Sequence, residues 1–124
     1  MIDHISIPVR DLGRASAFYE AVLATLGYAR LETRSASVAF GKRYSELWLN
    51  HRPDLLPQPL GSGAHVALRA SSPEMVDAFH AAALANGGAS DGAPGLRPQH
   101  GAGYYAAFIR DADGNRIEAV TFLS

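Results

Sequence analysis

Two short stretches of the chain alternate apolar and polar residues in the same phase. They are residues 2–9, IDHISIPV, and residues 63–70, GAHVALRA. Such alternation predicts a β-strand with one face against a core. The predicted core faces are formed by Ile5, Ile7 and Val9 in the first stretch and by Val66, Leu68 and Ala70 in the second. His4 and His65 lie on the opposite faces, at equivalent places 61 positions apart. Because a slip of one residue would exchange the faces, the shared phase indicates an internal repeat.

Each predicted strand is followed by a segment with the apolar spacing of a helix. The first segment runs from about residue 12 to 26, and the second from about 73 to 86. Asp11 and Ser72 directly precede the two segments and are typical N-cap residues. Glycines, which commonly end helices, follow both segments at Gly27, Gly87 and Gly88.

Three strand-like runs complete each half of the chain. They span about residues 28–34, 36–41 and 44–50 in the first half and about 89–93, 103–110 and 115–123 in the second. The sequence Asp113-Gly114-Asn115 predicts a tight hairpin turn between the last two runs. We therefore predict a single α+β domain over residues 1–124, built from two βαβββ modules. The modules are residues 1–50 and 64–124, joined by a linker rich in proline and glycine at 51–63.

One further segment, at about residues 91–103, is also rich in glycine and proline. It fits two interpretations, an entrance loop over a site and a disordered surface loop.

The composition removes several classes of function. The chain has 124 residues, 48% of them hydrophobic, and its formal net charge of -1 comes with no basic cluster, so a nucleic-acid partner is not expected. No apolar run reaches the roughly 18 residues of a membrane span, and the N-terminus lacks a signal pattern. We expect a soluble, cytoplasmic protein with a small-molecule partner. The chain has no cysteine, so histidine, aspartate and glutamate are its strong metal ligands.

The repeat places one histidine on the first strand and one glutamate on the last strand of each module. These residues are His4 and Glu46 in the first module and His65 and Glu118 in the second. If each sheet curls, its first and last strands can lie side by side, and two modules could present the four side chains at one point. Imidazole and carboxylate together suit a divalent Zn, Ni, Co, Fe or Mn ion. Two histidines with one carboxylate leave coordination positions open for a substrate.

Each of these residues also has a purely structural interpretation. A single histidine on a strand is often a surface residue or a hydrogen-bonding residue of the fold. Glu118 has Arg116 nearby in the sequence, and Glu46 has Lys42 and Arg43. Either glutamate could therefore form an ordinary surface ion pair.

We assign four further residues to contacts with a substrate: Trp48, Arg69, His100 and Tyr105. Trp48 fits a pocket wall and a core position equally well. The Tyr104-Tyr105 pair fits substrate contact, and it also fits one core residue beside one edge residue.

The opening MIDHISIPVRDLGRASAFYEAVLATLGY and the ending YYAAFIRDADGNRIEAV resemble the vicinal oxygen chelate superfamily. That superfamily includes glyoxalase I, extradiol dioxygenases, fosfomycin-resistance transferases and bleomycin-resistance proteins. The resemblance spans nearly the whole chain and implies paired βαβββ modules whose cupped mixed sheets surround a metal or ligand pocket. It implies that His4, His65 and Glu118 are the common ligand triad, with His4 facing the inside of the cup. Glu46, in ELWLN, matches the position where glyoxalase I-like members carry a fourth ligand.

The resemblance also favours a homodimer. Superfamily members commonly dimerise, and half-open sheets have exposed edges that a partner usually covers.

Four functions are consistent with the resemblance. The leading one is a glyoxalase I-like, metal-dependent lyase or isomerase acting on a small molecule with vicinal oxygens, in which Glu118 or Glu46 moves a proton between adjacent carbons. The second is an Fe(II) ring-cleaving dioxygenase that uses the triad with His51, His100 or Tyr105 as an acid–base group. The third is thiol transfer to fosfomycin, and the fourth is a non-enzymatic protein that binds an antibiotic.

Overall fold

The computed structural model describes residues 1–59 and 61–124 and contains two βαβββ modules. Position 60 of the predicted linker lies outside the described residues. The first module consists of β1 (Ile5–Val9), α1 (Leu12–Ala24), β2 (Ala29–Thr33), β3 (Ser37–Gly41) and β4 (Leu47–His51). The second consists of β5 (Val66–Arg69), α2 (Pro73–Ala85), β6 (Ala89–Leu96), the short 3-10 helix η1 (Pro98–His100), β7 (Tyr104–Arg110) and β8 (Arg116–Phe122). Within the described residues, no helix has the length and apolar character needed to cross a membrane.

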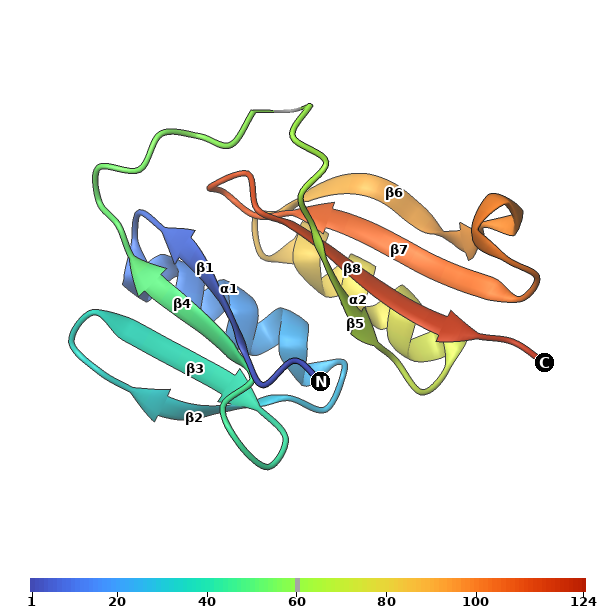
Figure 1. The fold of residues 1–124 in the computed structure, drawn as a ribbon, viewed down its shortest axis with the longest axis horizontal. Coiled ribbons are helices and arrows are strands. Elements are labelled where there is room, and N and C mark those ends of the chain that lie inside the picture. Colours follow the sequence, from blue (N-terminus) through green and yellow to red (C-terminus); the bar gives the residue numbers. More distant parts are fainter. Residues whose placement is uncertain (60) are drawn as a thin grey trace.

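Each module forms a four-stranded mixed sheet in which the first strand lies beside the last. The strand orders are β1-β4-β3-β2 and β5-β8-β7-β6. β1 is parallel to β4 and β5 is parallel to β8, while the other neighbours are antiparallel. The two sheets lie next to each other with both helices behind them, and α1 contacts α2 (Figure 1). We call the face of each sheet that lies opposite its helix the inner face.

The aliphatic faces of the repeated strands pack under the helices, as predicted. Val9 is fully buried and Ile7 is 7% exposed. Both belong to one apolar cluster with Val22 of α1, Phe79 of α2 and Ile109 of β7. Because residues of both modules share this cluster, the core is continuous across the two modules.

The predicted helix limits are confirmed to within two residues. Asp11 accepts a hydrogen bond from the Arg14 backbone N–H at 3.0 Å, and Ser72 accepts one from the Met75 backbone N–H at 3.3 Å. Both side chains therefore act as N-caps. Just beyond α1, Gly27 has a φ of 86°, which is the left-handed conformation that favours glycine after a helix.

Two predicted boundaries are wrong. The strand predicted at 89–93 continues to residue 96 and is followed by η1, so most of the predicted loop at 91–103 has regular structure. Glycine and proline are tolerated there because β6 is an edge strand with register shifts near Gly92 and Gly95. The turn between β7 and β8 is also longer than predicted, because Arg110 pairs with Arg116 and residues 111–115 form the loop.

The β7–β8 loop connects the second module to the first through a buried carboxylate. Asp111 is 9% exposed and accepts hydrogen bonds from the Tyr19 hydroxyl of α1 at 2.6 Å and from the Asn115 backbone N–H at 2.8 Å. The Asn115 side-chain amide donates to Asp111 and to the Pro8 carbonyl, both at 2.8 Å. We call the set Pro8, Arg10, Tyr19, Asp111, Asp113 and Asn115 the clasp.

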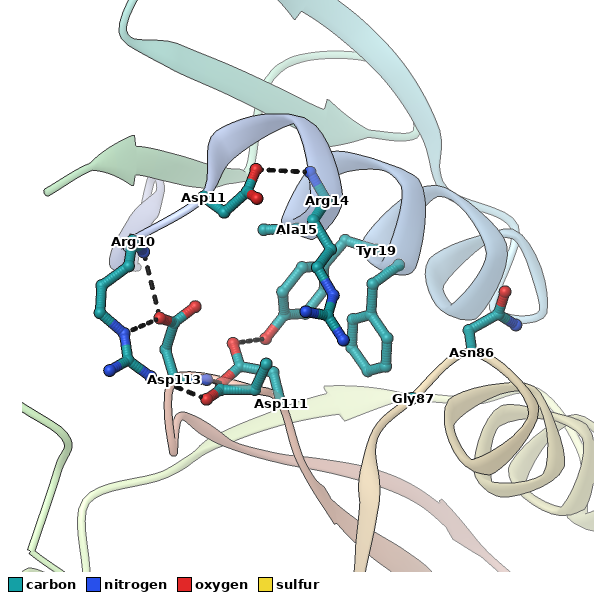
Figure 2. A pocket seen from close by; sticks show the side chains of 11 residues that line it. Arg10, Asp11, Arg14, Ala15, Tyr19, Asn86, Gly87, Asp111 and Asp113 are labelled. Atoms are coloured by element: carbon teal, nitrogen blue, oxygen red, sulfur yellow. Dashed lines mark hydrogen bonds and ion pairs between the residues drawn. The ribbon is translucent and has the colours of Figure 1, made fainter. Parts of the chain in front are cut away.

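Arg10 and Asp113 complete the clasp at the surface. The Arg10 Nε donates to Asp113 Oδ1 at 2.8 Å, and the Arg10 backbone N–H donates to the same oxygen at 3.1 Å (Figure 2). A pocket of about 230 Å³ opens beside these residues, between α1 and the segment that follows α2, with Arg14 and Asn86 among its lining residues. None of the predicted site residues lines it, so this pocket belongs to the contact between the modules.

Burial raises the pKa values of two residues of the clasp, Asp111 and Tyr19. Burial raises the pKa of the Asp111 carboxyl, while the hydrogen bonds from Tyr19 and Asn115 act in the opposite direction. Burial, together with the adjacent Asp111 carboxylate, raises the pKa of the Tyr19 hydroxyl well above its usual value. The Tyr19 hydroxyl is therefore protonated at neutral pH and acts as a donor to Asp111.

We expect Asp111→Ala to lower the free energy of unfolding by about 3 kcal/mol, because it removes the acceptor of the buried Tyr19 hydroxyl and the Asn115 amide. Urea unfolding followed by circular dichroism measures this change. Asp54→Ala is the matched control, since Asp54 is exposed in the linker, and its effect should stay within about 0.5 kcal/mol. A loss below about 1 kcal/mol for Asp111→Ala would contradict the role of the clasp.

Candidate functional site

His65 and Glu118 meet on the inner face of the second sheet. Glu118 lies on β8 opposite Ala67 of β5, and His65 directly precedes β5. The Glu118 side chain is 2% exposed, and its Oε1 lies 3.2 Å from His65 Nε2. A buried carboxylate is costly unless it is paired or coordinates a metal, so this contact is the main chemical feature of the face.

The contact of His65 Nδ1 bears on the protonation of Nε2, the ring nitrogen that faces Glu118. His65 Nδ1 lies 3.2 Å from the Gly63 carbonyl oxygen, which can only accept, so this contact favours the tautomer with the proton on Nδ1. In the neutral imidazole, Nε2 then presents a lone pair to a carboxylate oxygen that also presents one. The two atoms need a cation between them, either a proton on Nε2 or a metal ion.

The distance between these atoms suits a metal ion. Two ligands about 2.1 Å from one metal and roughly 90–110° apart are separated by about 3.0–3.4 Å. The observed 3.2 Å between Nε2 and Oε1 falls in this range. His65 and Glu118 therefore fit one side of a metal site, with the imidazole already in the tautomer that a ligand needs.

Tyr104 holds the second oxygen of the Glu118 carboxylate. Its hydroxyl donates to Glu118 Oε2, and burial together with this hydrogen bond raises the pKa of Tyr104 to about 12. The hydroxyl therefore stays protonated at neutral pH and orients the carboxylate, as hydrogen bonds to metal-ligating carboxylates usually do. Oε1 is left to face His65.

The predicted substrate contact at Tyr105 is corrected by the structure. The Tyr105 hydroxyl donates to Asp77 of α2 at 2.6 Å, and its side chain packs against the core on the helix side. Successive residues of a strand point to opposite faces, so its neighbour Tyr104 is the one at Glu118. Ala107 and Ile109 are buried against the core, which places Tyr105 on the helix side with them. The alternation of these three residues along the strand is the signal that the sequence contains.

Aromatic rings and an arginine surround the His65–Glu118 pair on the inner face. The Phe108 ring centroid lies 6.4 Å from that of His65, and the His100 ring lies 5.2 Å from that of Tyr104. The Arg69 guanidinium lies 4.5 Å from the ring centroid of Phe122, farther along the same face. Two predicted substrate-contact residues, His100 and Arg69, are thus on the side of the sheet that carries Glu118.

The inner face of the first sheet forms a separate open groove of about 650 Å³. Its lining includes Asp3, His4, Ser6, Arg34, Ser37, Tyr44, Ser45, Trp48 and Asn50. The His4 side chain is 52% exposed, and its Nδ1 lies 2.8 Å from Asp3 Oδ2. The Arg34 guanidinium stacks 4.6 Å from the Trp48 ring centroid. Trp48 is therefore a wall of the groove, which resolves the two interpretations of that residue.

The predicted equivalence of Glu46 and Glu118 is wrong. Ser6 pairs with Trp48, while Ala67, the repeat equivalent of Ser6, pairs with Glu118. Trp48 thus occupies the place of Glu118 in the first module. Glu46 precedes β4, does not line the groove of His4, and accepts a hydrogen bond from the Lys42 backbone N–H at 3.1 Å.

His4 and the His65–Glu118 pair belong to different sheets. Within residues 1–59 and 61–124, no three His, Asp or Glu side chains come together as a metal cluster. β1 and β5, whose beginnings carry the two histidines, run in opposite directions in Figure 1. One chain thus brings together two of the four predicted ligands, His65 and Glu118. His4 lies exposed in the other groove, and Glu46 does not line that groove.

Comparison with known proteins gives one family and several solved structures. A model of the "Glyoxalase/Bleomycin resistance protein/Dioxygenase superfamily" matches residues 1–119. A glyoxalase/bleomycin resistance protein from Albidiferax ferrireducens is 34% identical with a TM-score of 0.81, over 95% of each chain. Among curated proteins, no match was found.

Two more distant structures share the fold alone. A glyoxalase/bleomycin resistance protein/dioxygenase family enzyme from Burkholderia phytofirmans is 21% identical with a TM-score of 0.74, over 98% of each chain. The fosfomycin resistance protein FosX from Listeria monocytogenes is 19% identical with a TM-score of 0.71, over 97% of this chain and 91% of that one.

We expect Tyr104→Phe to remove one late-titrating phenol. The pKa of Tyr104 is raised to about 12, so the contribution of this hydroxyl to stability is complete below about pH 10 and is lost as the pH rises through about 12. The ultraviolet absorbance titration of the variant, subtracted from that of the wild type, should have a midpoint near 12. A midpoint near the ordinary value of about 10 would show that Tyr104 does not hold Glu118.

Proposed function

Because this chain belongs to the glyoxalase/bleomycin resistance protein/dioxygenase superfamily, we propose that it is a metal-dependent enzyme acting on a small molecule with two neighbouring oxygen atoms. The observation that carries the proposal is the position of His65 Nε2, 3.2 Å from the buried Glu118 carboxylate, while the other ring nitrogen contacts the Gly63 carbonyl oxygen. The proposed ligands are His65, Glu118 and His4.

His4 would come from a second copy of the chain. Its groove is open, and the His65 side chain is 46% exposed, so both halves of the proposed site are accessible to a partner. In a two-fold homodimer, the first module of one copy can face the second module of the other, which completes two identical sites. The predicted homodimer is thus part of the proposed chemistry.

A divalent metal bound there would act as a Lewis acid for the two substrate oxygens. The residues of the chain have separate tasks around it. His65 and Glu118 supply donor atoms, and Tyr104 keeps the carboxylate oriented through its hydroxyl. Trp48 and Phe108 supply apolar walls that reduce the access of water. His100, whose ring contacts that of Tyr104, would exchange a proton with the substrate as the acid–base group.

The position of Glu46 changes the order of the predicted reactions. The glyoxalase I-like lyase needs Glu46 as a fourth ligand, and Trp48 stands in the place that corresponds to Glu118. Three ligands of two-His, one-carboxylate type suit an Fe(II) dioxygenase or a fosfomycin-type transferase. We therefore propose dioxygenation first, because His100 also supplies the acid–base group which that reaction requires. Oxygen uptake with catechol by the Fe(II)-loaded protein separates it from transfer and isomerisation.

We expect Glu118→Gln and Glu46→Gln to differ sharply in metal content. Glu118→Gln removes a proposed ligand and should reduce zinc bound at equilibrium at least tenfold. Glu46→Gln keeps the wild-type affinity, because Glu46 does not line the His4 groove. Zinc titration by isothermal calorimetry compares the two glutamate variants directly. An equal loss of zinc affinity in both variants, or a loss in Glu46→Gln alone, would show that Glu46 is a ligand of the metal.

Mixing two inactive variants tests whether two copies share the site. His4→Ala and His65→Ala should each bind no metal at the site as pure homodimers. After unfolding and refolding together, about half of the dimers are mixed and each carries one intact site, so metal binding should recover to about a quarter of the wild-type level. No recovery on mixing, with dimers confirmed by sedimentation, would mean that the ligands come from one chain.

A further inference from the structure

Arg97 lies on the same face of the second sheet as the proposed metal site, with the Phe108 ring between its guanidinium and His65. Its guanidinium is 5.4 Å from the ring centroid of Phe108, whose other neighbour is the His65 ring at 6.4 Å. Phe108 also pairs in register with Glu118. No aspartate or glutamate pairs with Arg97 in the part of the chain that the structure describes.

Backbone groups hold this guanidinium in place. The Arg97 Nη2 donates to the Ala93 carbonyl at 2.6 Å and Nη1 donates to the Leu96 carbonyl at 3.4 Å. The Arg97 backbone N–H donates to the Tyr104 carbonyl at 2.7 Å. An arginine has five N–H donors, so most of the fork stays available to a ligand. Because the side chain is already ordered, binding an anion there costs little further entropy.

Two glycines of β6 make room for the guanidinium. A Cβ at Gly92 would lie 2.9 Å from the Phe108 ring and 3.2 Å from Arg97 Nη2, and one at Gly95 would lie 3.3 Å from Arg97 Nη1. Neither glycine has a positive φ, so backbone conformation does not require glycine at these positions. Close approach of the Phe108 ring, with Arg97 next to it, accounts for Gly92, and close approach of Arg97 accounts for Gly95.

The other charges on this part of the inner face do not neutralise Arg97. Asp91 lies 3.5 Å from Arg110 Nε and 3.6 Å from Arg116 Nε, so it is shared between two cations. Glu118 is engaged by His65 and Tyr104. A bound divalent ion would add further positive charge. This electrostatic balance favours an anionic ligand.

We propose that Arg97 selects the substrate, and that the substrate is a small acid whose carboxylate or phosphonate group stands close to its two metal-binding oxygens. The inference rests on the proposed function, because it places the substrate oxygens at His65 and Glu118. The acidic group pairs with the Arg97 fork in the two-pronged geometry that guanidinium offers to such anions. Phe108 lies under the connecting part of the molecule.

The test compares probes that differ only by an acidic group. Zinc-loaded protein is titrated with catechol, 2,3-dihydroxybenzoate and 3,4-dihydroxybenzoate, and dissociation constants are measured by calorimetry. We expect at least one of the two acids to bind the wild type about tenfold to a hundredfold more tightly than catechol. Arg97→Gln should reduce that ratio to about one, with catechol affinity and zinc content unchanged.

Two further variants control the experiment. Arg14→Gln removes an exposed arginine from the helix side and should keep the wild-type preference. Gly95→Ala displaces the guanidinium without removing its charge and should reduce the preference several-fold, which also covers the case in which Arg97→Gln fails to fold.

The outcomes separate this inference from the proposed function. A wild type that binds zinc and catechol but prefers neither acid would overturn the role of Arg97 alone, as would a preference that persists in Arg97→Gln. A wild type that binds no zinc or no catechol would overturn the proposed function and this inference with it.

Discussion

The buried carboxylate of Asp111 fixes how the two halves of this protein are joined. It belongs to the second module and accepts the Tyr19 hydroxyl of the first, while Asn115 bonds back to the Pro8 carbonyl. The modules are locked side by side with both helices behind the sheets (Figure 1), the inner face of the first sheet forms an open groove, and the His65 side chain on the second is 46% exposed. His4 and His65 consequently lie on separate faces, so a site that uses both needs a second copy of the chain. The hydrogen-bonded β7–β8 loop fixes the arrangement of the modules, and in this arrangement the proposed metal site can form only in a dimer.

The second module carries the more complete half of the site. Within residues 1–59 and 61–124, the buried Glu118 carboxylate pairs with no lysine or arginine, and its two oxygens contact different residues, Tyr104 and His65. Burying a carboxylate in this way stabilises the fold poorly and prepares it well to bind a cation. The first module has an exposed histidine and a tryptophan where the second has its glutamate. The repeat has therefore diverged into a ligand-rich half and an aromatic half, which favours three protein ligands over four.

Strand phase explains which residues could be predicted and which could not. His4 and His65 were identified because period-two alternation sets their faces, and the packing of Ile7 and Val9 against the helices confirms that phase. Glu46 was misplaced because alternation does not determine the register between β1 and β4, and a shift of two residues keeps the face but changes the neighbour. The choice of Tyr105 over Tyr104 is wrong because two adjacent tyrosines do not by themselves indicate which one faces the inner side of the sheet.

Other features depend on contacts that no local pattern contains. The sequence pattern underestimates the length of β6 because its glycines and its proline are typical of loops, yet Gly92 makes room for Phe108 and Arg97, and Gly95 makes room for Arg97. Arg97 itself is distant in sequence from His65 and reaches its neighbourhood through Phe108. Asp111 and Asn115 are residue types typical of turns. Their hydrogen bonds to Tyr19 and Pro8 join the two modules, and the repeat pattern contains no sign of such contacts.

We propose that His65 and Glu118 of one copy share a metal with His4 of another. Anomalous X-ray scattering from crystals grown with Co²⁺, recorded at the cobalt edge, tests this shared site most directly. We expect one peak per chain, about 2.0–2.2 Å from His65 Nε2, from Glu118 Oε1 and from a ring nitrogen of His4 in a two-fold-related copy. A peak without His4, or no peak between His65 and Glu118, would contradict a metal site shared by two copies.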